Sequence, residues 1–440
     1  MELRETKLVT LIFTTIAALI FILSISAQAK TEDAFVRVSG TQFTLQGKPY
    51  QFLGTNFWYG MNLGMNNMAS RARLVRELDR LKILGVTNLR ILGMSEGPSN
   101  EPWRIIPAAQ NTPGQFSEPV LEGLDFLLTE MAKRNMHAVV CLSNFWPWSG
   151  GMAQYVKWNL KNSIPYPPPH PGGSWDTYQI YTAQFYSNEA ALRQYEAAIT
   201  KVITRTNTIT KKPYKEDPTI MAWQLANEPR GIQNVLYFNR WINTSAGLIK
   251  SMDPNHLVTT GVEGETPNPQ SAGLDLIENH SSRNIDYVTV HIWAQNWGWY
   301  DPMNASGTYE NAARKMKEYL LVHVQKAKTL GKPLVLEEFG ISRDLNSHDP
   351  ASPTTIRDRY YREVFETVLN EIKKDSPLRG VNFWAWSGEG FPAKPYGGFW
   401  KAGDPFTGDP PHETQGWYSV YHTDKSTLDV ISEFARKISL

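Results

Sequence analysis

The sequence predicts a (β/α)8 barrel, an α/β TIM-barrel fold in which eight parallel strands alternate with helices. Eight short apolar segments recur along the chain, and amphipathic segments with helical spacing follow seven of them. An acidic residue also stands at the tip of the fourth apolar segment, where barrels of this class place functional side chains. A doubly wound open sheet is the competing arrangement, but no Gly-rich phosphate-binding turn follows the first strand.

Each predicted element can be assigned from its pattern. A small hairpin over 35–52, with turns at Gly40 and Gly47, comes first. The predicted strands cover 51–56, 86–92, 137–143, 219–226, 256–262, 287–291, 333–338 and 380–386. The predicted helices cover 70–84, 119–134, 188–206, 236–252, 309–330, 354–374 and 427–438, and the connection after residue 262 has no clear helical pattern.

Three long connections follow strands rather than helices, so we expect all three on the C-terminal face of the barrel. They cover 145–185, 292–308 and 387–417, and the first contains Trp146, Trp148, Trp158 and Trp175. Flat aromatic rings in Gly- and Pro-rich loops suit stacking against sugar rings. We expect some of these rings to pack as the cores of their loops and others to line an elongated cleft.

The N-terminal segment 1–29 has the pattern of a secretory signal peptide. Arg4 and Lys7 supply its positive end, residues 8–25 its apolar run, and 27–29 an Ala-x-Ala cleavage site. An uncleaved membrane anchor is the alternative, because the run approaches the about 18 residues needed to span a membrane. The Ala-x-Ala ending favours cleavage. Residues 30–440 are then expected to be a single catalytic domain, extracellular or periplasmic and free of the membrane.

Composition excludes several other classes of function. The formal net charge of the 440-residue chain is +1, which gives no surface for nucleic acid. The chain shows no internal repeat and no linker to a second module. Cys141 is the only cysteine and lies in an apolar strand, so an intrachain disulfide is excluded and an inert core thiol is expected. We expect a monomer without a cofactor.

The fourth strand and its end form the motif on which the functional prediction depends. The apolar run 219–226 stops at Asn227-Glu228-Pro229, because a proline cannot donate to the next ladder bond. Pro229 is expected to hold Glu228 in an extended conformation, with its carboxylate at the tip of the strand. The alternative is an acidic residue that caps the strand and pairs with Arg230.

Polar and aromatic residues stand at the ends of the other strands as well. Two carboxylates from different strands, among amides and aromatic rings, are what glycoside hydrolysis requires. One carboxyl must carry a proton for the leaving oxygen while the other is ionised, which calls for two unequal environments. The set comprises Asn56, Trp58, Arg90, Asn144, Trp146, Asn227, Glu228, His291, Trp293, Glu337, Glu338, Trp384 and Trp386.

With these motifs the sequence resembles glycoside hydrolase family five. The resemblance rests on Asn227-Glu228-Pro229, on 337–340 after the seventh strand, on Arg90, and on Phe383-Trp384. Segments 223–230, 336–340 and 416–421 are similar to the endo-β-1,4-mannanases of plants and fungi within that family, and the resemblance covers the whole mature chain.

The resemblance implies roles for individual residues. Glu228 matches the general acid/base, and Glu338 rather than Glu337 matches the nucleophile. Neighbouring residues of a strand face opposite ways, so only one of this pair can point into the mouth of the barrel. Where the family has a Tyr near the nucleophile this chain has Trp293, whose N–H donates but cannot accept. The expected substrate-binding residues are Trp58, Arg90, Asn144, Trp146, Asn227, Arg230, His291, Trp293 and Trp384.

The implied activity is retaining hydrolysis of internal β-1,4 bonds in β-mannan polysaccharides. The alternatives within the family are a cellulase, a β-glucanase or an exo-acting mannosidase. A polysaccharide-binding protein without catalysis would lack one carboxylate, and both are present. No metal is expected at the site, since His170, His412 and His422 stand isolated in loops, while a structural calcium elsewhere is compatible with the sequence.

Overall fold

The structure, a computed structural model, describes residues 34–438 and contains the predicted barrel. Its main sheet has eight parallel strands in the order β10-β9-β8-β5-β4-β13-β12-β11. The fold prediction is therefore confirmed. The strands are β4 (Phe52–Asn56), β5 (Asn88–Leu92), β8 (His137–Cys141), β9 (Ile220–Gln224), β10 (Leu257–Thr259), β11 (Val288–Ile292), β12 (Leu334–Phe339) and β13 (Leu378–Phe383).

The two end strands of that order, β10 and β11, are joined by single hydrogen bonds rather than by a ladder. The Asp286 amide donates to the Val258 carbonyl (2.8 Å), and the His291 amide donates to the Glu263 carbonyl (2.9 Å). The Thr259 hydroxyl adds a bond to the Tyr287 carbonyl (2.9 Å). These bonds bring the ends of the sheet together, so that all eight strand tips surround one mouth.

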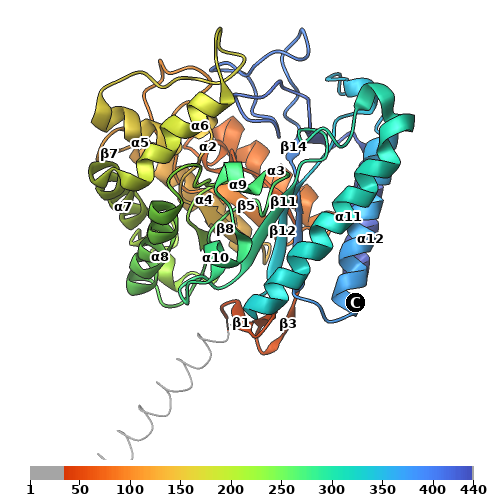
Figure 1. The fold of residues 1–440 in the computed structure, drawn as a ribbon, viewed down its shortest axis with the longest axis horizontal. Helices are drawn as coiled ribbons and strands as arrows, with labels where there is room; N and C mark the ends of the chain where they lie inside the picture. Colours follow the sequence, from red (N-terminus) through yellow and green to blue (C-terminus); the bar gives the residue numbers. More distant parts are fainter. Residues whose placement is uncertain (1–33, 439–440) are drawn as a thin grey trace, which may run out of the picture.

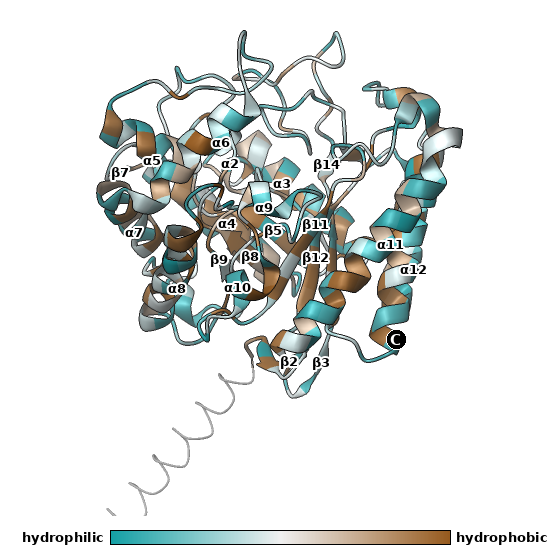
Figure 2. Cartoon of the chain, in the orientation of Figure 1, coloured by the Kyte–Doolittle hydropathy of each residue, from teal (hydrophilic) through white to brown (hydrophobic). Residues whose placement is uncertain are grey.

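Helices pack around the strands, as the amphipathic patterns require (Figure 1). The seven predicted helices are present, and the unclear connection after β10 holds only two short ones. Figure 2 shows mainly apolar residues on the central strands, with both polar and apolar residues on α7, α8 and α11. The helices are α2 (Gly60–Leu63), α3 (Met68–Ile83), α4 (Glu118–Ala132), α5 (Gly151–Leu160), α6 (Trp175–Ala183), α7 (Glu189–Ile203), α8 (Val235–Met252), α9 (Pro269–Ala272), α10 (Leu276–His280), α11 (Ala305–Leu330), α12 (Thr355–Lys373) and α13 (Lys425–Ile438).

The predicted N-terminal hairpin is a three-stranded antiparallel sheet. It consists of β1 (Arg37–Ser39), β2 (Gln42–Leu45) and β3 (Lys48–Tyr50). This sheet lies at the lower end of the molecule in Figure 1, at the N-terminal ends of the barrel strands. Phe43 of β2 is fully buried there, with its ring 5.4 Å from that of Tyr287. The small sheet thus closes the bottom of the barrel.

The opposite end of the barrel carries the long connections, which project as loops at the top of Figure 1. Four short strands also lie in connections that follow barrel strands: β6 (Gln110–Thr112) and β7 (Gln115–Phe116) after β5, and β14 (Trp386–Gly388) and β15 (Val420–Tyr421) after β13. The predicted signal peptide, 1–29, lies outside the described residues, so it stays a prediction together with the domain boundary at residue 30. Within residues 34–438, no helix is long and apolar enough to cross a membrane.

Substituting Phe43 separates the stability of the barrel from its chemistry. Phe43→Ala is expected to lower the free energy of unfolding by about 3–5 kcal/mol, because it opens a cavity beneath the strands. Because the top face is remote from this cavity, kcat should stay within about twofold at temperatures where the protein is folded. Chemical denaturation of Phe43→Ala, with Phe43→Leu as the milder control, measures the first quantity. A large loss of kcat in fully folded protein would contradict the separation.

Candidate active site

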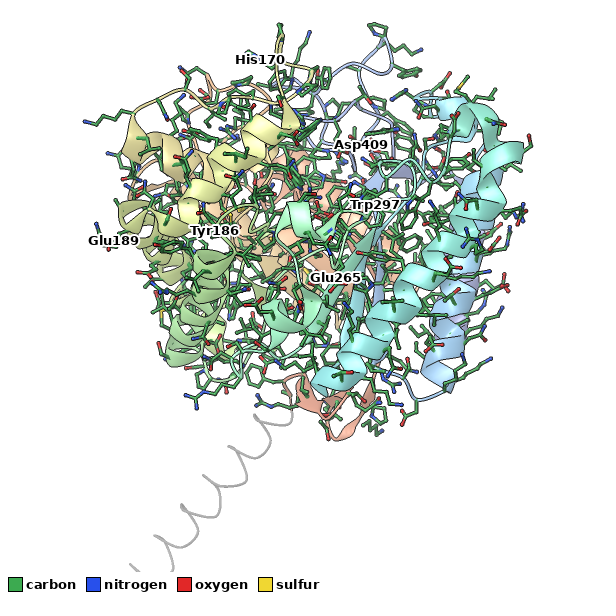
Figure 3. The ribbon with its side chains drawn as sticks, in the orientation of Figure 1. His170, Tyr186, Glu189, Glu265, Trp297 and Asp409 are labelled. Carbon is green, nitrogen blue, oxygen red and sulfur yellow. The ribbon has the colours of Figure 1, made fainter. Side chains whose placement is uncertain are left out.

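The candidate active site is a cleft of about 610 Å³ at the C-terminal ends of the barrel strands. Loops that follow several strands contribute to it, including the loop that carries Trp297, labelled in Figure 3. Its lining combines Trp and Phe rings with about as many polar and charged side chains. The lining residues are Trp146, Trp148, Pro168, Pro169, Trp175, Gln179, Asn227, Glu228, Arg230, Trp293, Asn296, Trp297, Glu338, Trp384, Phe399, His412, Glu413, Thr414 and Trp417.

Glu228 projects into this cleft from an unusual backbone conformation. Its φ is +48°, so the prediction that Pro229 holds it extended is wrong. The Glu228 amide donates to the Gly261 carbonyl (3.0 Å), while the neighbouring Asn227 amide donates to Ser143 (2.9 Å). The chain is thus held between β8 and β10 while it turns, and this requires a backbone region that non-glycine residues seldom adopt.

Three N–H groups surround the carboxylate of Glu228. The Nδ1 atom of His291 lies 2.6 Å from Oε1, and the indole nitrogen of Trp293 donates to the same oxygen (3.2 Å). The indole nitrogen of Trp146 donates to Oε2 (2.5 Å). Burial alone would raise the pKa of Glu228, but His291, Arg230 and Trp146 lower it to about 2. In this environment Glu228 is a carboxylate rather than an acid.

Glu338 is held by the guanidinium of Arg90. Nη1 of Arg90 forms a short ion pair with Oε1 of Glu338, and both side chains are almost completely buried. Burial raises the pKa of Glu338 to about 7, although His291 and Arg90 act in the opposite direction. The two glutamates therefore occupy unequal environments, as the sequence predicts, but the proton affinity is greater on Glu338 than on Glu228.

The doublet Glu337-Glu338 is not separated by strand parity alone. The pairing of β11 with β12 shifts by one residue at this point, so that Val290 faces Leu336 but His291 faces Glu338. This bulge turns both carboxylates toward Arg90, with Oε2 of Glu337 3.6 Å from Nε. Glu338 lines the cleft, whereas Glu337 is fully buried below it and accepts a hydrogen bond from Gln224 (2.6 Å).

His291 connects the two sides of the site. In the described part of the chain, one of its ring nitrogens, one oxygen of Glu228 and one of Glu338 all lie within 4.8 Å of one another. This spacing also suits a metal ion. However, Arg90 already forms an ion pair with Glu338 and the imidazole hydrogen-bonds Glu228, so the donor set favours ion pairing over a metal.

The other predicted site residues fall into two groups. Trp384, Trp293, Trp146, Asn227 and Arg230 line the cleft. Arg230 forms an ion pair with Glu263 (2.6 Å) instead of Glu228, and its guanidinium lies 4.9 Å from the ring of Trp146.

Trp58, Asn144 and Arg90 lie beneath the cleft and support it. The indole of Trp58 donates to the Gly408 carbonyl (2.9 Å). Asn144 accepts hydrogen bonds from the Trp146 amide (3.0 Å) and from the Asn227 side chain (3.1 Å). Of the three, Asn144 and Arg90 hold residues that line the cleft, while Trp58 anchors the loop that follows β13.

The aromatic loops divide as expected into lining and packing residues. Trp146, Trp148, Trp175 and Trp297 line the cleft. Trp158 packs against Tyr155, with ring centroids 5.4 Å apart, and thus belongs to the core of its loop. Trp299 and Tyr300 also pack against neighbouring aromatic rings outside this cleft.

Several lining residues were missed because they lie in loops whose conformation has no periodic signal. Among them are Asn296, Phe399, His412 and Glu413. Within the described residues, Nε2 of His412 and Oε2 of Glu413 are buried without a hydrogen-bond partner. Burial also raises the pKa of Glu413 well above its usual value. Unpaired buried polar atoms in a cleft are suited to a polar ligand.

Comparisons with known proteins place the chain in a family. A model of the family described as "GH family 5 beta-mannosidase-like" matches residues 33–440. The chain belongs to glycoside hydrolase family 5. It is therefore a glycoside hydrolase, as the resemblance implies.

Individual members of family 5 are similar along most of the chain. A mannan endo-1,4-beta-mannosidase of Solanum lycopersicum is 30% identical, covering 82% of this chain and 86% of its own. A family 5 mannosidase from Rhizomucor miehei is 37% identical with a TM-score of 0.83, covering 93% of this chain and 98% of its own. A variant of that enzyme, solved in complex with mannosyl-fructose, has a TM-score of 0.85 and the same identity.

The buried doublet can be resolved by substitution. Glu338→Ala is expected to lose turnover of an aryl β-glycoside by roughly 10⁴-fold or more, because a nucleophile in the cleft would be missing. Glu337→Gln keeps the shape and one acceptor below the cleft, so kcat/KM should fall by no more than about tenfold, or ~1.4 kcal/mol. Steady-state kinetics on both variants, with circular dichroism as a folding control, measure the difference. The reverse order of losses would exchange the two assignments.

Proposed function

We propose that this family 5 hydrolase is an endo-β-1,4-mannanase that acts with retention of configuration. The observation that carries the proposal is the pair Glu228 and Glu338, with carboxylate oxygens within 4.8 Å, in an aromatic cleft. Retaining glycosidases have carboxyls about 5–5.5 Å apart, whereas inverting enzymes leave about 6.5–9.5 Å for a water. The names of the similar plant proteins and of the Rhizomucor mannosidase support a β-mannoside as substrate.

In this mechanism Glu338 attacks the anomeric carbon and Glu228 protonates the leaving oxygen. Arg90 opposes the rise that burial causes in the pKa of Glu338, and it fixes the orientation of the attacking oxygen by a charge-assisted hydrogen bond. Trp384 offers its ring as the floor of the cleft beneath the reacting sugar. Asn227, whose side chain is held by Arg90 (2.7 Å), is suited to bind a hydroxyl beside the reacting carbon.

Cleavage inside a polymer is supported on the side of the cleft next to Glu228. A second groove of about 710 Å³ shares Gln179, Arg230, Asn296 and Trp297 with the cleft. It continues to the loop after β10, which carries Asn268. Together they form an elongated surface that is suited to several sugar units on the leaving-group side.

An exo-acting mannosidase is the second candidate, because segments after three strands meet at one wall of the cleft. The ring of His412 lies 5.3 Å from that of Trp103 and 5.5 Å from that of Trp175. These three residues come from loops after three different strands, β13, β5 and β8. A wall at this position would limit the number of sugars on the non-reducing side of the cleaved bond.

The proposal includes secretion and a monomeric enzyme. Secretion rests on the signal-like pattern of 1–29 and not on the described residues. The substrate is then an extracellular or periplasmic β-mannan.

A polymer assay tests the proposed activity and separates it from the second candidate. On a soluble mannan, the viscosity is expected to fall steeply before many reducing ends appear, because internal cuts shorten the chains. Glucomannan, cellulose and xylan serve as comparison substrates. Release of mannose with little change in viscosity would favour the exo-acting candidate, and faster cleavage of cellulose or xylan would overturn the choice of mannan. Early α-anomer in the product, observed by proton NMR, would contradict retention.

Glu413 is proposed to bind sugar hydroxyls in this cleft. Glu413→Ala is expected to raise KM for mannooligosaccharides by roughly 10- to 100-fold, with a smaller change in kcat. Removing one partner of a buried hydrogen bond costs about 1–3 kcal/mol, because the other partner is left unsatisfied. Glu433→Gln, at a half-exposed ion pair with Lys437 on the last helix, is the matched control and should behave as wild type. An unchanged KM for Glu413→Ala would remove this residue from the substrate site.

A further inference from the structure

His291 has a carboxylate at each of its ring nitrogens. Nδ1 lies 2.6 Å from Oε1 of Glu228 and 3.4 Å from Oε2 of Glu338. Nε2 lies 3.6 Å from Oε2 of Glu337 and, within the described residues, has no hydrogen-bond partner. A neutral imidazole carries one N–H and one lone pair, whereas an ionised carboxylate can only accept. A neutral His291 would therefore direct a lone pair at a carboxylate, unless one of the three glutamates were protonated.

Each of those glutamates already has a partner that can only donate a hydrogen bond to it. Glu228 accepts from the indoles of Trp146 and Trp293. Glu338 accepts from Arg90. These donors stabilise the ionised carboxylates, because a carboxylic acid proton would compete with them.

Glu337 also accepts a hydrogen bond from a group that can only donate at that point. It accepts from the side-chain amide of Gln224, whose oxygen in turn accepts from Nε of Arg90 (2.8 Å), so the orientation of the amide is fixed. An imidazolium with a proton on both nitrogens directs one N–H at Glu228 and the other toward the carboxylate of Glu337, 3.6 Å away.

The charges around His291 agree with this state. Three carboxylates, at Glu228, Glu337 and Glu338, face one guanidinium, that of Arg90. The remaining charged neighbours, Arg230 and Glu263, neutralise each other in a 2.6 Å ion pair. Burial alone would lower the pKa of His291, but Glu338, Glu228 and Glu337 raise it to about 10.

We propose that His291 stores the proton that is delivered to the leaving-group oxygen, and that Glu228 passes this proton from Nδ1 to the substrate. The inference rests on the proposed function for the role of Glu228 as the group that meets the leaving oxygen. The inference concerns the protonation state of Glu228 before the reaction: Glu228 is then a carboxylate and not a carboxylic acid.

The bonds and protons balance over the two half-reactions. First, an electron pair of Glu338 forms the bond to the anomeric carbon, and the pair of the broken glycosidic bond remains on the leaving oxygen. That oxygen takes a proton from Glu228, which takes the Nδ1 proton, and His291 becomes neutral with its other proton on Nε2, toward Glu337. Then the oxygen of water bonds to the anomeric carbon, the pair of the ester bond returns to Glu338, and the water proton returns through Glu228 to Nδ1.

The charge of Glu338 couples the nucleophile to this proton. While Glu338 is a carboxylate, its negative charge stabilises the imidazolium of His291. Formation of the glycosyl ester removes that charge, so the pKa of His291 falls and the proton leaves toward Glu228. Hydrolysis of the ester restores the charge and draws the proton back.

The protonation state can be measured without any substrate. In wild-type enzyme labelled with ¹⁵N-histidine, both ring nitrogens of His291 should be protonated at about pH 8, above the ordinary histidine pKa of about 6.5. The signals are assigned by their loss in His291→Asn. In Glu338→Gln the titration midpoint of His291 should fall by roughly one to three units, the usual effect of a nearby opposite charge. A neutral ring at about pH 8 in the wild type would overturn the proposal and leave the proposed mannanase function standing.

Kinetics then distinguish proton storage from simple positioning. His291→Asn keeps an N–H donor near Glu228 but has no proton to give. Hydrolysis of a mannooligosaccharide should fall by roughly 10²- to 10⁴-fold, the usual contribution of general acid catalysis, while an aryl mannoside with an activated leaving group should lose far less. The alkaline limb of kcat/KM should move to lower pH.

Trp293→Phe is the matched control, because it removes the other N–H donor to the same oxygen of Glu228 without removing a titratable group. Its rate can change, but its alkaline limb should not move to lower pH, because losing a donor to Glu228 can only raise the affinity of the site for the proton. Equal losses on both substrates in His291→Asn, with an unmoved alkaline limb, would show a positioning role and contradict proton storage.

Discussion

The buried guanidinium of Arg90 is the interaction on which the rest of the site depends. From β5 it donates to Gln224 on β9 (2.8 Å), to Asn56 on β4 (3.0 Å), to Asn227 (2.7 Å) and to Glu338 on β12. Removing one partner of such a buried pair costs about 3–5 kcal/mol, because a charge is left uncompensated. A single cation thus sets the relative positions of four segments whose tips form the mouth of the barrel.

The two catalytic carboxylates differ because different kinds of donor hold them. Glu338 faces the Arg90 cation in a deeply buried place, while Glu228 is surrounded by N–H groups from His291 and two indoles. The donors around Glu228 hold its pKa low, while the Arg90 cation only partly offsets the burial that raises the pKa of Glu338 to about 7. The proton for the leaving group is therefore not held by Glu228 at rest, and we place it on a third residue, His291. A positive charge on His291 also balances the carboxylates of the site. Without it, three neighbouring carboxylates would face one guanidinium, that of Arg90, because Arg230 is paired with Glu263.

The sequence was sufficient for the barrel because apolar strands and amphipathic helices are local patterns. It also predicted the place of Glu228 and Glu338 at the ends of such strands, and the structure has both in the cleft, while their catalytic roles stay a prediction. It was insufficient for the bulge in β12 that turns Glu337 toward Arg90, and for the φ of +48° at Glu228, because both arise from pairing with neighbouring strands. His412 and Glu413 were missed for a related reason, since their loop is ordered by contacts with distant loops rather than by its own pattern.

At position 293 this chain has a Trp where the family has a Tyr, and this difference bears on the chemistry of the site. The hydroxyl of a Tyr at this position can both donate and accept near the nucleophile, whereas an indole can only donate. The structure directs that N–H to Oε1 of Glu228, the oxygen that His291 also contacts. The indole is therefore a second donor to this oxygen, and a donor to a carboxylate lowers its affinity for a proton. A lower proton affinity on Glu228 favours the imidazolium of His291, so a Trp at this position supports the proposed storage of the proton on histidine.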